Sequence, residues 1–90
     1  MRGKQYLIRG QVQGVGYRYF ALEAAERLGV KGFARNLYNG DVEVHAEADE
    51  VTLKLFKREL ERGPRMAQVT EVAESDLTAT GVYSSFLIRG

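Results

Sequence analysis

Apolar and polar residues alternate along several segments of the chain, and this alternation predicts β-strands. The clearest case is residues 41–48, where apolar side chains occupy the even positions and Glu43, His45 and Glu47 occupy odd ones. Successive side chains of a strand point to opposite faces of a sheet, so we expect the even face to lie against the core and the odd face to be solvated. Less regular patterns predict further strands at residues 5–12, 30–36, 67–74 and 83–89.

Two other segments carry apolar residues at the three- to four-residue spacing of a helix. The first spans residues 18–28, and Gly29 after it is a suitable C-terminal stop. The second begins at Asp49 and Glu50, whose negative charges favour a helix N-terminus, and ends at Gly63–Pro64. The resulting order β-α-β-β-α-β predicts an α+β fold of the ferredoxin-like type. In this fold two helices lie on one face of a mostly antiparallel sheet, here with an extra C-terminal strand.

The composition fits a single small domain over residues 1–90 and argues against several classes of function. A net charge of +1 gives no broad basic surface, so nucleic acid is not an expected partner. The absence of cysteine excludes disulfides, thiol catalysis and thiolate metal sites. No apolar run is long enough to span a membrane, and the first residues form a strand pattern instead of a signal peptide. We therefore expect a cytoplasmic protein that does not associate with membranes.

Two glycines and an arginine stand between the first predicted strand and the first predicted helix. Gly14 and Gly16 permit positive φ angles, which allow successive backbone N–H groups to converge on one point. The helix N-terminus adds unpaired N–H groups there, and Arg18 adds a planar fork of donors that matches phosphate. The same residues are also compatible with a plain tight turn followed by a solvated arginine. Our hypothesis is a phosphate-binding loop, here called the cradle, formed by Arg18 and by the backbone of Gln13, Gly14, Val15, Gly16 and Tyr17.

Asn36 stands at the end of a predicted strand, shortly before a predicted hairpin turn at Asn39–Gly40. A two-residue turn pairs Asn36 with Glu43, and a four-residue turn pairs it with Asp41. Either even loop places Asn36 on the polar face of the hairpin, whereas an odd loop would turn it toward the core. We expect an even loop, so that Asn36 is not a buried structural amide. A local alternative remains, in which Asn36 only bonds the backbone of its own turn.

Residues 10–18, GQVQGVGYR, resemble the first signature of the acylphosphatase family. Residues 32–42, GFARNLYNGDV, resemble the second signature at the expected separation, and the resemblance covers essentially the whole chain. Gln11 and Ala48 depart from the family pattern, but both lie away from the implied chemistry. The resemblance implies the ferredoxin-like fold and a hydrolase that cleaves carboxyl–phosphate anhydrides. It also implies that Arg18 and Asn36 are the catalytic pair.

Acyl phosphates suit a protein with few reactive side chains. The sequence has no cysteine, one histidine, and no pattern that indicates a Ser-His-Asp arrangement, a metal site or a cofactor site. A carboxylate leaving group departs without protonation, so positioning and charge stabilisation are sufficient. In the implied reaction Arg18 and the cradle hold the phosphate, and Asn36, which is too weak a base to deprotonate water, orients the attacking water. Inorganic phosphate is then product and inhibitor, and we expect a monomer that uses no metal or cofactor.

Other functions are compatible with a ferredoxin-like fold. An RNA-binding domain needs exposed aromatic residues on its central strands, but the predicted strand at 41–48 is acidic and free of aromatics. A regulatory module that binds a small molecule or phosphate without catalysis remains an alternative. So does a phosphate-binding domain of a larger carbamoyl-phosphate-processing protein. We expect hydrolysis because such modules usually accompany a partner domain, whereas this chain has 90 residues.

Overall fold

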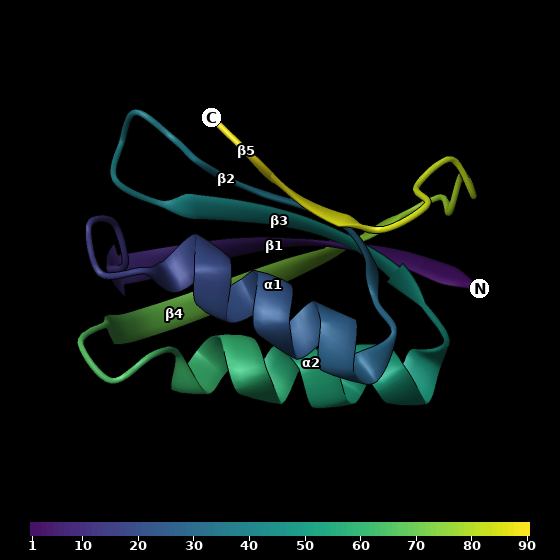
Figure 1. Cartoon of the computed structure of the whole chain (residues 1–90), viewed down its shortest axis with the longest axis horizontal. Helices are drawn as coiled ribbons and strands as arrows, with labels where there is room; N and C mark the ends of the chain where they lie inside the picture. The colour runs from purple at the N-terminus through teal and green to yellow at the C-terminus, as the bar shows by residue number, and fades with distance from the viewer.

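A five-stranded β-sheet with two helices on one of its faces makes up the structure, a computed structural model that describes residues 1–90 (Figure 1). Along the chain the elements are β1 (Arg2–Gln11), α1 (Tyr17–Leu28), β2 (Lys31–Asn36), β3 (Val42–Ala48), α2 (Glu50–Arg62), β4 (Gln68–Leu77) and β5 (Phe86–Arg89). This order is the ferredoxin-like plan with an extra C-terminal strand, so the predicted fold class is confirmed.

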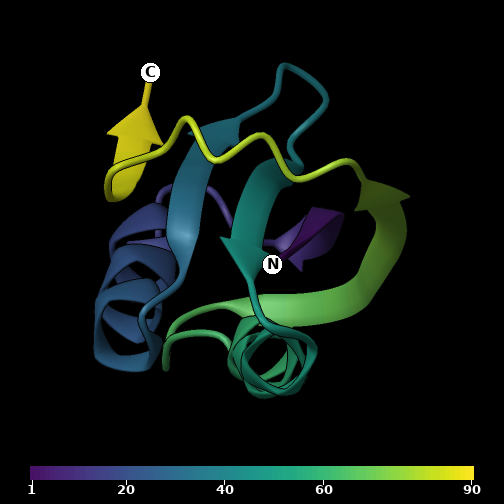
Figure 2. The same ribbon diagram turned by 90° about the vertical axis from the view of Figure 1, so that its right-hand side faces the viewer.

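The strand order across the sheet is β4-β1-β3-β2-β5. The pairs β1–β3, β1–β4 and β2–β3 are antiparallel, and β2–β5 is parallel. Because β4 and β5 lie at opposite edges, the connection between them has to cross the sheet. Figure 2 shows this connection passing over the face that the helices leave open.

The last two strands have different bounds from those that the sequence pattern predicts. β4 continues to Leu77, which pairs with Gly3 of β1, and β5 begins only at Phe86. Residues 75–77 show no clear apolar alternation, but backbone pairing with β1 keeps them in the sheet. Pairing with a neighbour, and not the local pattern, therefore decides where these edge strands begin and end.

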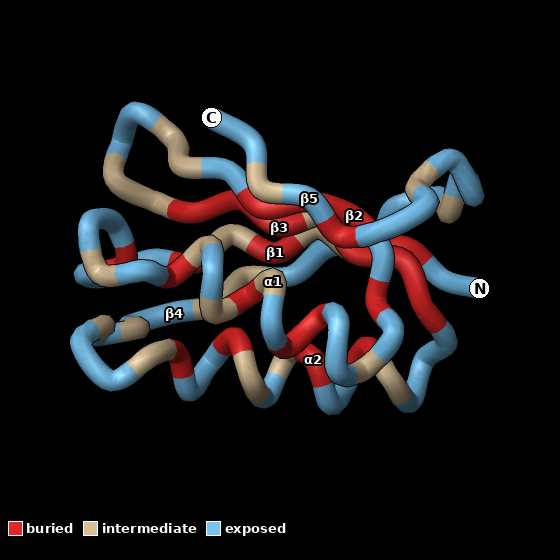
Figure 3. The backbone as a smooth tube through the Cα atoms, in the orientation of Figure 1, coloured by how far each residue is buried: buried red, intermediate tan, exposed pale blue.

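The hydrophobic core fills the space between the sheet and the helices. The even-numbered residues of β3 face this core, as predicted: Val42 and Val44 are 0% exposed. Tyr6 of β1 pairs with Val44 and is also buried. Figure 3 shows buried positions concentrated in the central strands and on the inner sides of the helices, whereas β4 is largely exposed.

The odd-numbered face of β3 is not solvated, contrary to the prediction. Glu43 and Glu47 are both buried. The connection between β4 and β5 crosses this face and contacts Glu47, whereas Glu43 lies against the side chains of Gln5 and Arg35. Glu47 accepts hydrogen bonds from the N–H groups of Thr80 and Gly81 at 2.8 and 3.0 Å, and from the Thr80 hydroxyl at 3.1 Å. Burial raises the pKa of the Glu47 carboxyl, but these hydrogen bonds outweigh it and hold the pKa below its ordinary value. The carboxylate therefore ties the crossing connection to the sheet.

Buried side chains of different size hold the two helices on the sheet. α1 buries Ala21, Ala24 and Ala25, and these small residues allow its backbone to lie close to the strands. α2 buries larger residues, among them Phe56 and Leu60. The helices are also joined to each other, since the Tyr17 hydroxyl of α1 donates to the Leu60 carbonyl at 2.6 Å.

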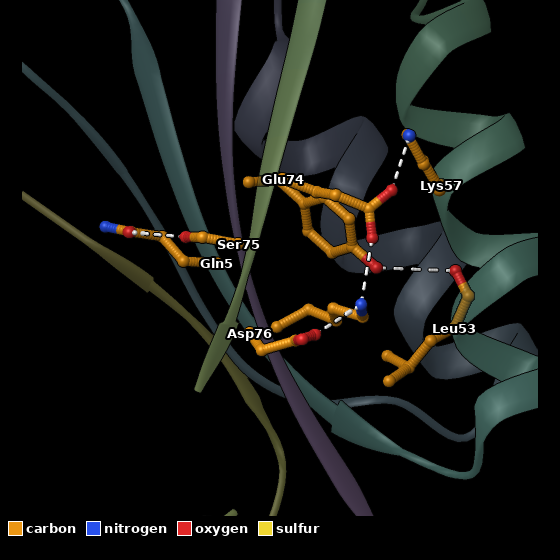
Figure 4. A network of polar contacts seen from close by, with 8 residues as sticks. Gln5, Leu53, Lys57, Glu74, Ser75 and Asp76 are labelled. Carbon is orange, nitrogen blue, oxygen red and sulfur yellow. Dashed lines mark hydrogen bonds and ion pairs between the residues drawn. The ribbon is translucent and has the colours of Figure 1, made fainter. Parts of the chain in front are cut away.

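Polar contacts fix α2 against β1 and β4 (Figure 4). Lys57 Nζ lies 2.5 Å from Glu74 Oε1, and Lys4 Nζ lies 3.0 Å from Glu74 Oε2. Hydrogen bonds from these two lysines hold the pKa of the Glu74 carboxyl below its ordinary value. The Tyr6 hydroxyl donates to the Leu53 carbonyl at 3.4 Å. The charged residues of this sheet edge therefore serve the docking of α2.

Candidate active site

The connection from β1 to α1 has the backbone conformation that its glycines predict. Gly14 and Gly16 have φ angles of 76° and 77°, and Gly16 is the left-handed residue that precedes α1. A Cβ built on either glycine would have no atom within 4 Å, so the positive φ, and not crowding, favours glycine here. The same open space leaves the backbone of this loop accessible to a ligand.

The N-terminus of α1 has no side-chain cap and no acidic residue in its first turn. Its first hydrogen bond runs from the Phe20 N–H to the Gly16 carbonyl at 3.0 Å. The N–H groups of Tyr17, Arg18 and Tyr19 therefore have no acceptor within the helix. Together with the positive end of the helix dipole, these groups favour the binding of an anion.

Two residues of the cradle are anchored in the core. Tyr17 is 1% exposed, and burial raises the pKa of its hydroxyl, which donates to Leu60. Val15 is partly buried and packs against the same core. The Tyr17 side chain does not face a surface ligand, so this residue can contribute only its backbone N–H. The anchoring also fixes the loop that carries Gly14 and Gly16.

Arg18 stands in the first turn of α1 and is partly exposed. Its Nη1 donates to the Arg89 carbonyl at the end of β5, at 2.8 Å. A guanidinium carries five N–H donors, so this single contact leaves donors for a phosphate. The parallel pairing of β5 with β2 brings Arg89 to this position.

Asn36 ends β2 opposite Val42, so the hairpin loop comprises residues 37–41. This loop has an odd number of residues and is closed by a hydrogen bond from the Leu37 N–H to the Asp41 carbonyl at 2.8 Å. The expected even loop, and with it the placement of Asn36 on the polar face, is therefore wrong. Asn36 lies on the helix-covered face, the same face as Ala34 and as the core side of Val42.

Asn36 is nevertheless not a buried structural amide, in agreement with the second half of the prediction. It is partly exposed because β2 ends there, beyond the fully buried Ala34. The turn takes its side-chain hydrogen bonds from Asn39 instead: Asn39 Oδ1 accepts from the Asp41 N–H at 3.0 Å. The alternative in which Asn36 only bonds its own turn is thus not seen, and its pairing with Val42 places Asn36 on the same side of the sheet as α1.

A hollow of about 540 Å³ lies at this end of the sheet and is lined by Gln13, Arg35, Asn36, Leu37, Tyr38 and Gly90. It brings together two of the predicted site residues, Gln13 and Asn36. Arg18 is connected to the hollow through its hydrogen bond to Arg89, the neighbour of Gly90. The other predicted residues, Gly14 to Tyr17, do not line it.

Four of the lining residues were not among the predicted site residues. Arg35, Leu37 and Tyr38 flank Asn36 in the second motif, and this proximity is the signal that could have found them. Gly90 has no such signal, because only the pairing of β5 with β2 brings it here.

Arg35 pairs with Glu43 on the face of the sheet opposite the helices, and the Glu43 carboxylate holds the Arg35 guanidinium in place. Arg35 Nε lies 2.5 Å from Glu43 Oε1, and Gln5 Nε2 donates to Glu43 Oε2 at 2.6 Å. Burial raises the pKa of the Glu43 carboxyl, but the hydrogen bonds from Arg35 and Gln5 outweigh it and lower the pKa. Glu43 is therefore a partner of Arg35 and not an acid or base of the site.

Metal-ligating side chains do not cluster in residues 1–90: no group of three or more His, Cys, Asp or Glu side chains could hold an ion. Metal independence itself stays a prediction. Neither α1 nor α2 is long and apolar enough to cross a membrane.

Comparison with known proteins gives one consistent family. The acylphosphatase family model matches residues 4–88. An acylphosphatase of Thermotoga maritima is 43% identical over 89 residues, which cover 99% of this chain and 98% of that protein. Among solved structures, the acylphosphatase from Bacillus subtilis matches with a TM-score of 0.96 at 29% identity, with 100% of both chains covered. An acylphosphatase from Coxiella burnetii matches with a TM-score of 0.92 at 31% identity, covering 98% of this chain and 92% of that one.

The structural class is a ferredoxin-like sheet whose first helix begins after a left-handed glycine and has no side-chain cap. Within that class the chain belongs to the acylphosphatase family, because the family model and the relatives match it over nearly its whole length. It is therefore an enzyme, an acylphosphatase. The resemblance found in the two sequence motifs is confirmed.

Proposed function

We propose that the protein hydrolyses the carboxyl–phosphate anhydride of small acyl phosphates, releasing a carboxylate and inorganic phosphate. The observation that carries the proposal is the uncapped N-terminus of α1, which is entered through left-handed Gly14 and Gly16 and adjoins Arg18. The name of the relatives supports the same reaction.

The phosphate group binds in the cradle. Arg18 presents a planar fork of donors, and the backbone N–H groups of residues 13–17 present further donors that are fixed in place by the buried Tyr17. In the transition state negative charge spreads over the equatorial oxygens of the phosphoryl group. Donors that already point at these oxygens stabilise this charge without having to reorganise.

Asn36 orients the water that attacks phosphorus. Its side chain lies on the same side of the sheet as α1, and it is accessible to solvent at the end of β2. An amide is too weak a base to take a proton from water, so its contribution is position and not proton transfer. The carboxylate product leaves without protonation, and the site accordingly needs no general acid.

The hollow next to the cradle offers room for the acyl group. Leu37 and Tyr38 give this hollow apolar surface, and Tyr38 is fully exposed. In-line attack requires the water at Asn36 and the departing carboxylate to be on opposite sides of phosphorus, so the acyl group lies in the part of the hollow away from the Asn36 amide while the phosphate contacts the cradle. The proposed reaction uses no metal and no cofactor, and the enzyme acts as a monomer.

Hydrolysis of benzoyl phosphate by the purified protein in the presence of EDTA tests this function. We expect turnover, with competitive inhibition by inorganic phosphate because the product occupies the same cradle. Arg18→Gln is the matched control, since its loss of activity excludes a contaminating phosphatase. Phosphate binding without hydrolysis would support the regulatory module instead. Activity that EDTA abolishes and Mg²⁺ or Zn²⁺ restores would contradict the metal-free reaction.

A further inference from the structure

The side chain of Gln13 joins the cradle to the β2–β3 hairpin. Gln13 Nε2 donates to the Leu37 carbonyl and to the Asp41 carbonyl, both at 2.8 Å. These two carbonyls lie at the base of the hairpin loop, which the Leu37 N–H to Asp41 carbonyl bond closes. A single amide from the β1–α1 connection therefore holds the base of the loop from outside.

These hydrogen bonds act next to Asn36. Leu37 follows Asn36 directly, so the Leu37 carbonyl is fixed within one residue of the proposed water-positioning side chain. Arg18 lies on the other side of the link, on the segment that Tyr17 anchors in the core. Gln13 thus connects the segment that carries the phosphate ligand Arg18 to the segment that carries Asn36.

Both N–H bonds of the Gln13 amide are used by these two acceptors. A primary amide has two donor hydrogens, and each points to one carbonyl. β3 of the hairpin also pairs with β1, up to Ile8 opposite Val42. Beyond this pairing, Asp41 Oδ2 lies 3.5 Å from Arg9 Nε, in an ion pair that is half exposed on the arginine side. Exposed ion pairs contribute little, so the Gln13 amide is the side-chain contact that ties the base of this loop to the β1–α1 connection.

We propose that Gln13 is a positioning residue, whose side chain sets the place of Asn36 relative to the cradle instead of binding the phosphate. This inference rests on the proposed function of Asn36 as the residue that orients water. A displacement of about 1 Å in a reacting group can lower a rate by roughly a hundredfold. Loss of the two Gln13 hydrogen bonds needs to shift Asn36 only slightly to affect catalysis. The effect should appear in kcat, because phosphate binding by Arg18 and the backbone does not depend on Asn36.

A double-mutant cycle with Asn36→Ala tests the inference. Gln13→Ala should lower kcat for benzoyl phosphate by about tenfold or more and leave KM and phosphate inhibition within about twofold. In the Asn36→Ala background the same substitution should cause no further loss of kcat, because the residue through which it acts is gone. Gln13→Met, which keeps the length of the side chain without its donors, should behave like Gln13→Ala.

The control is Gln11→Ala, an exposed glutamine two residues earlier that should leave kcat unchanged. Thermal unfolding of every variant separates a local effect from a loss of the fold, and Gln13→Met preserves packing if Gln13→Ala is unstable. Full kcat in both Gln13 variants, or losses that add in the double variant, would overturn the positioning role. An equal change in KM and in phosphate inhibition would show that the Gln13 side chain contacts substrate, which also overturns it. If Asn36→Ala alone kept full kcat, the proposed role of Asn36 would fail, and the inference with it.

Discussion

The two helices begin in opposite ways, although each starts with N–H groups that need acceptors. At α2 the protein supplies the acceptor itself: Asp49 accepts a hydrogen bond from the Thr52 N–H at 2.8 Å, and Glu50 adds negative charge in the first turn. At α1 the equivalent residue is Gly16, which has no side chain, and the first turn has no acidic residue. The protein thus caps the start of α2 itself, whereas it leaves the N–H groups at the start of α1 without an acceptor, as the proposed phosphate site requires.

A carboxylate placed at the start of α1 should make the two termini alike and abolish catalysis. We expect Gly16→Asp to have kcat/KM at least about a hundredfold below Gly16→Asn, because its charge repels the substrate phosphate and its oxygens compete for the N–H groups. Asp and Asn both tolerate left-handed backbone at a similar cost of about 1 kcal/mol, so the pair differs mainly in charge. Steady-state kinetics measures the ratio. Equal activities would show that the start of α1 does not bind the phosphate.

Arg18 at the start of α1 and Asn36 at the end of β2 should affect different steps of the reaction. Arg18→Gln should impair both binding and rate, by roughly ten- to a hundredfold or more, because it loses charge-assisted hydrogen bonds. Arg18→Lys should not restore activity, since a point charge does not reproduce the fork.

Asn36→Ala should lower kcat by about a hundredfold or more while KM and phosphate inhibition stay nearly constant. Kinetics of the three variants, with circular dichroism to confirm folding, decides the matter; full kcat in Asn36→Ala would contradict water positioning.

Removal of the cap of α2 should change stability and leave catalysis intact. Asp49→Ala should lower Tm by about 4–8 °C, the usual effect of losing an N-cap in a domain of this size. Asp49→Asn is the matched control, because its amide oxygen still accepts the hydrogen bond. We expect kcat and KM to stay unchanged in both variants. Lost activity at unchanged Tm would contradict the separation of the two helix termini into a stabilising one and a functional one.

Glu47, like Asp49, accepts hydrogen bonds from backbone N–H groups of the protein itself. Its substitution should have the smallest effect of those considered, a change in stability that depends on pH. The pKa of this carboxyl lies below its ordinary value of 4.5. The unfolded chain therefore takes up the proton first, so this stabilisation is present above about pH 4.5 and is lost as the pH falls through the folded pKa. Glu47→Gln should lower Tm by a few degrees at pH 7, and the difference from the native protein should shrink below pH 4.5. A difference that is constant from pH 7 to pH 2 would show that the charge of Glu47 contributes nothing.

The backbone conformation of the β1–α1 connection could be predicted from the sequence because local residues determine it. The positive φ angles there are ones that glycine adopts readily, and the spacing of nearby apolar residues predicts the helix that follows. The even face of β3 was predicted for the same reason. The two family motifs then singled out Arg18 and Asn36, which local chemistry alone could not assign to catalysis.

The placement of Asn36 and the burial of the acidic residues could not be predicted, because they depend on contacts across the chain. The Asn39–Gly40 pair favours a two-residue turn, but the Leu37–Asp41 hydrogen bond and the Gln13 amide stabilise a five-residue loop. One residue more or less in a loop turns the side chain to the other face of the sheet. Glu47 is buried by the connection from β4 to β5, whose residues lie more than thirty positions later in the chain.

An NMR titration of the ¹⁵N-labelled protein with inorganic phosphate tests most directly whether the start of α1 is the anion site. We expect the backbone N–H signals of Val15 to Arg18 to shift and to saturate, because phosphate binds to these groups. The N–H signals of Val51 and Thr52 at the start of α2 should stay in place, and they report any general effect of ionic strength in the same spectra. Shifts of similar size at both helix starts, or no saturable shift between Val15 and Arg18, would contradict the account.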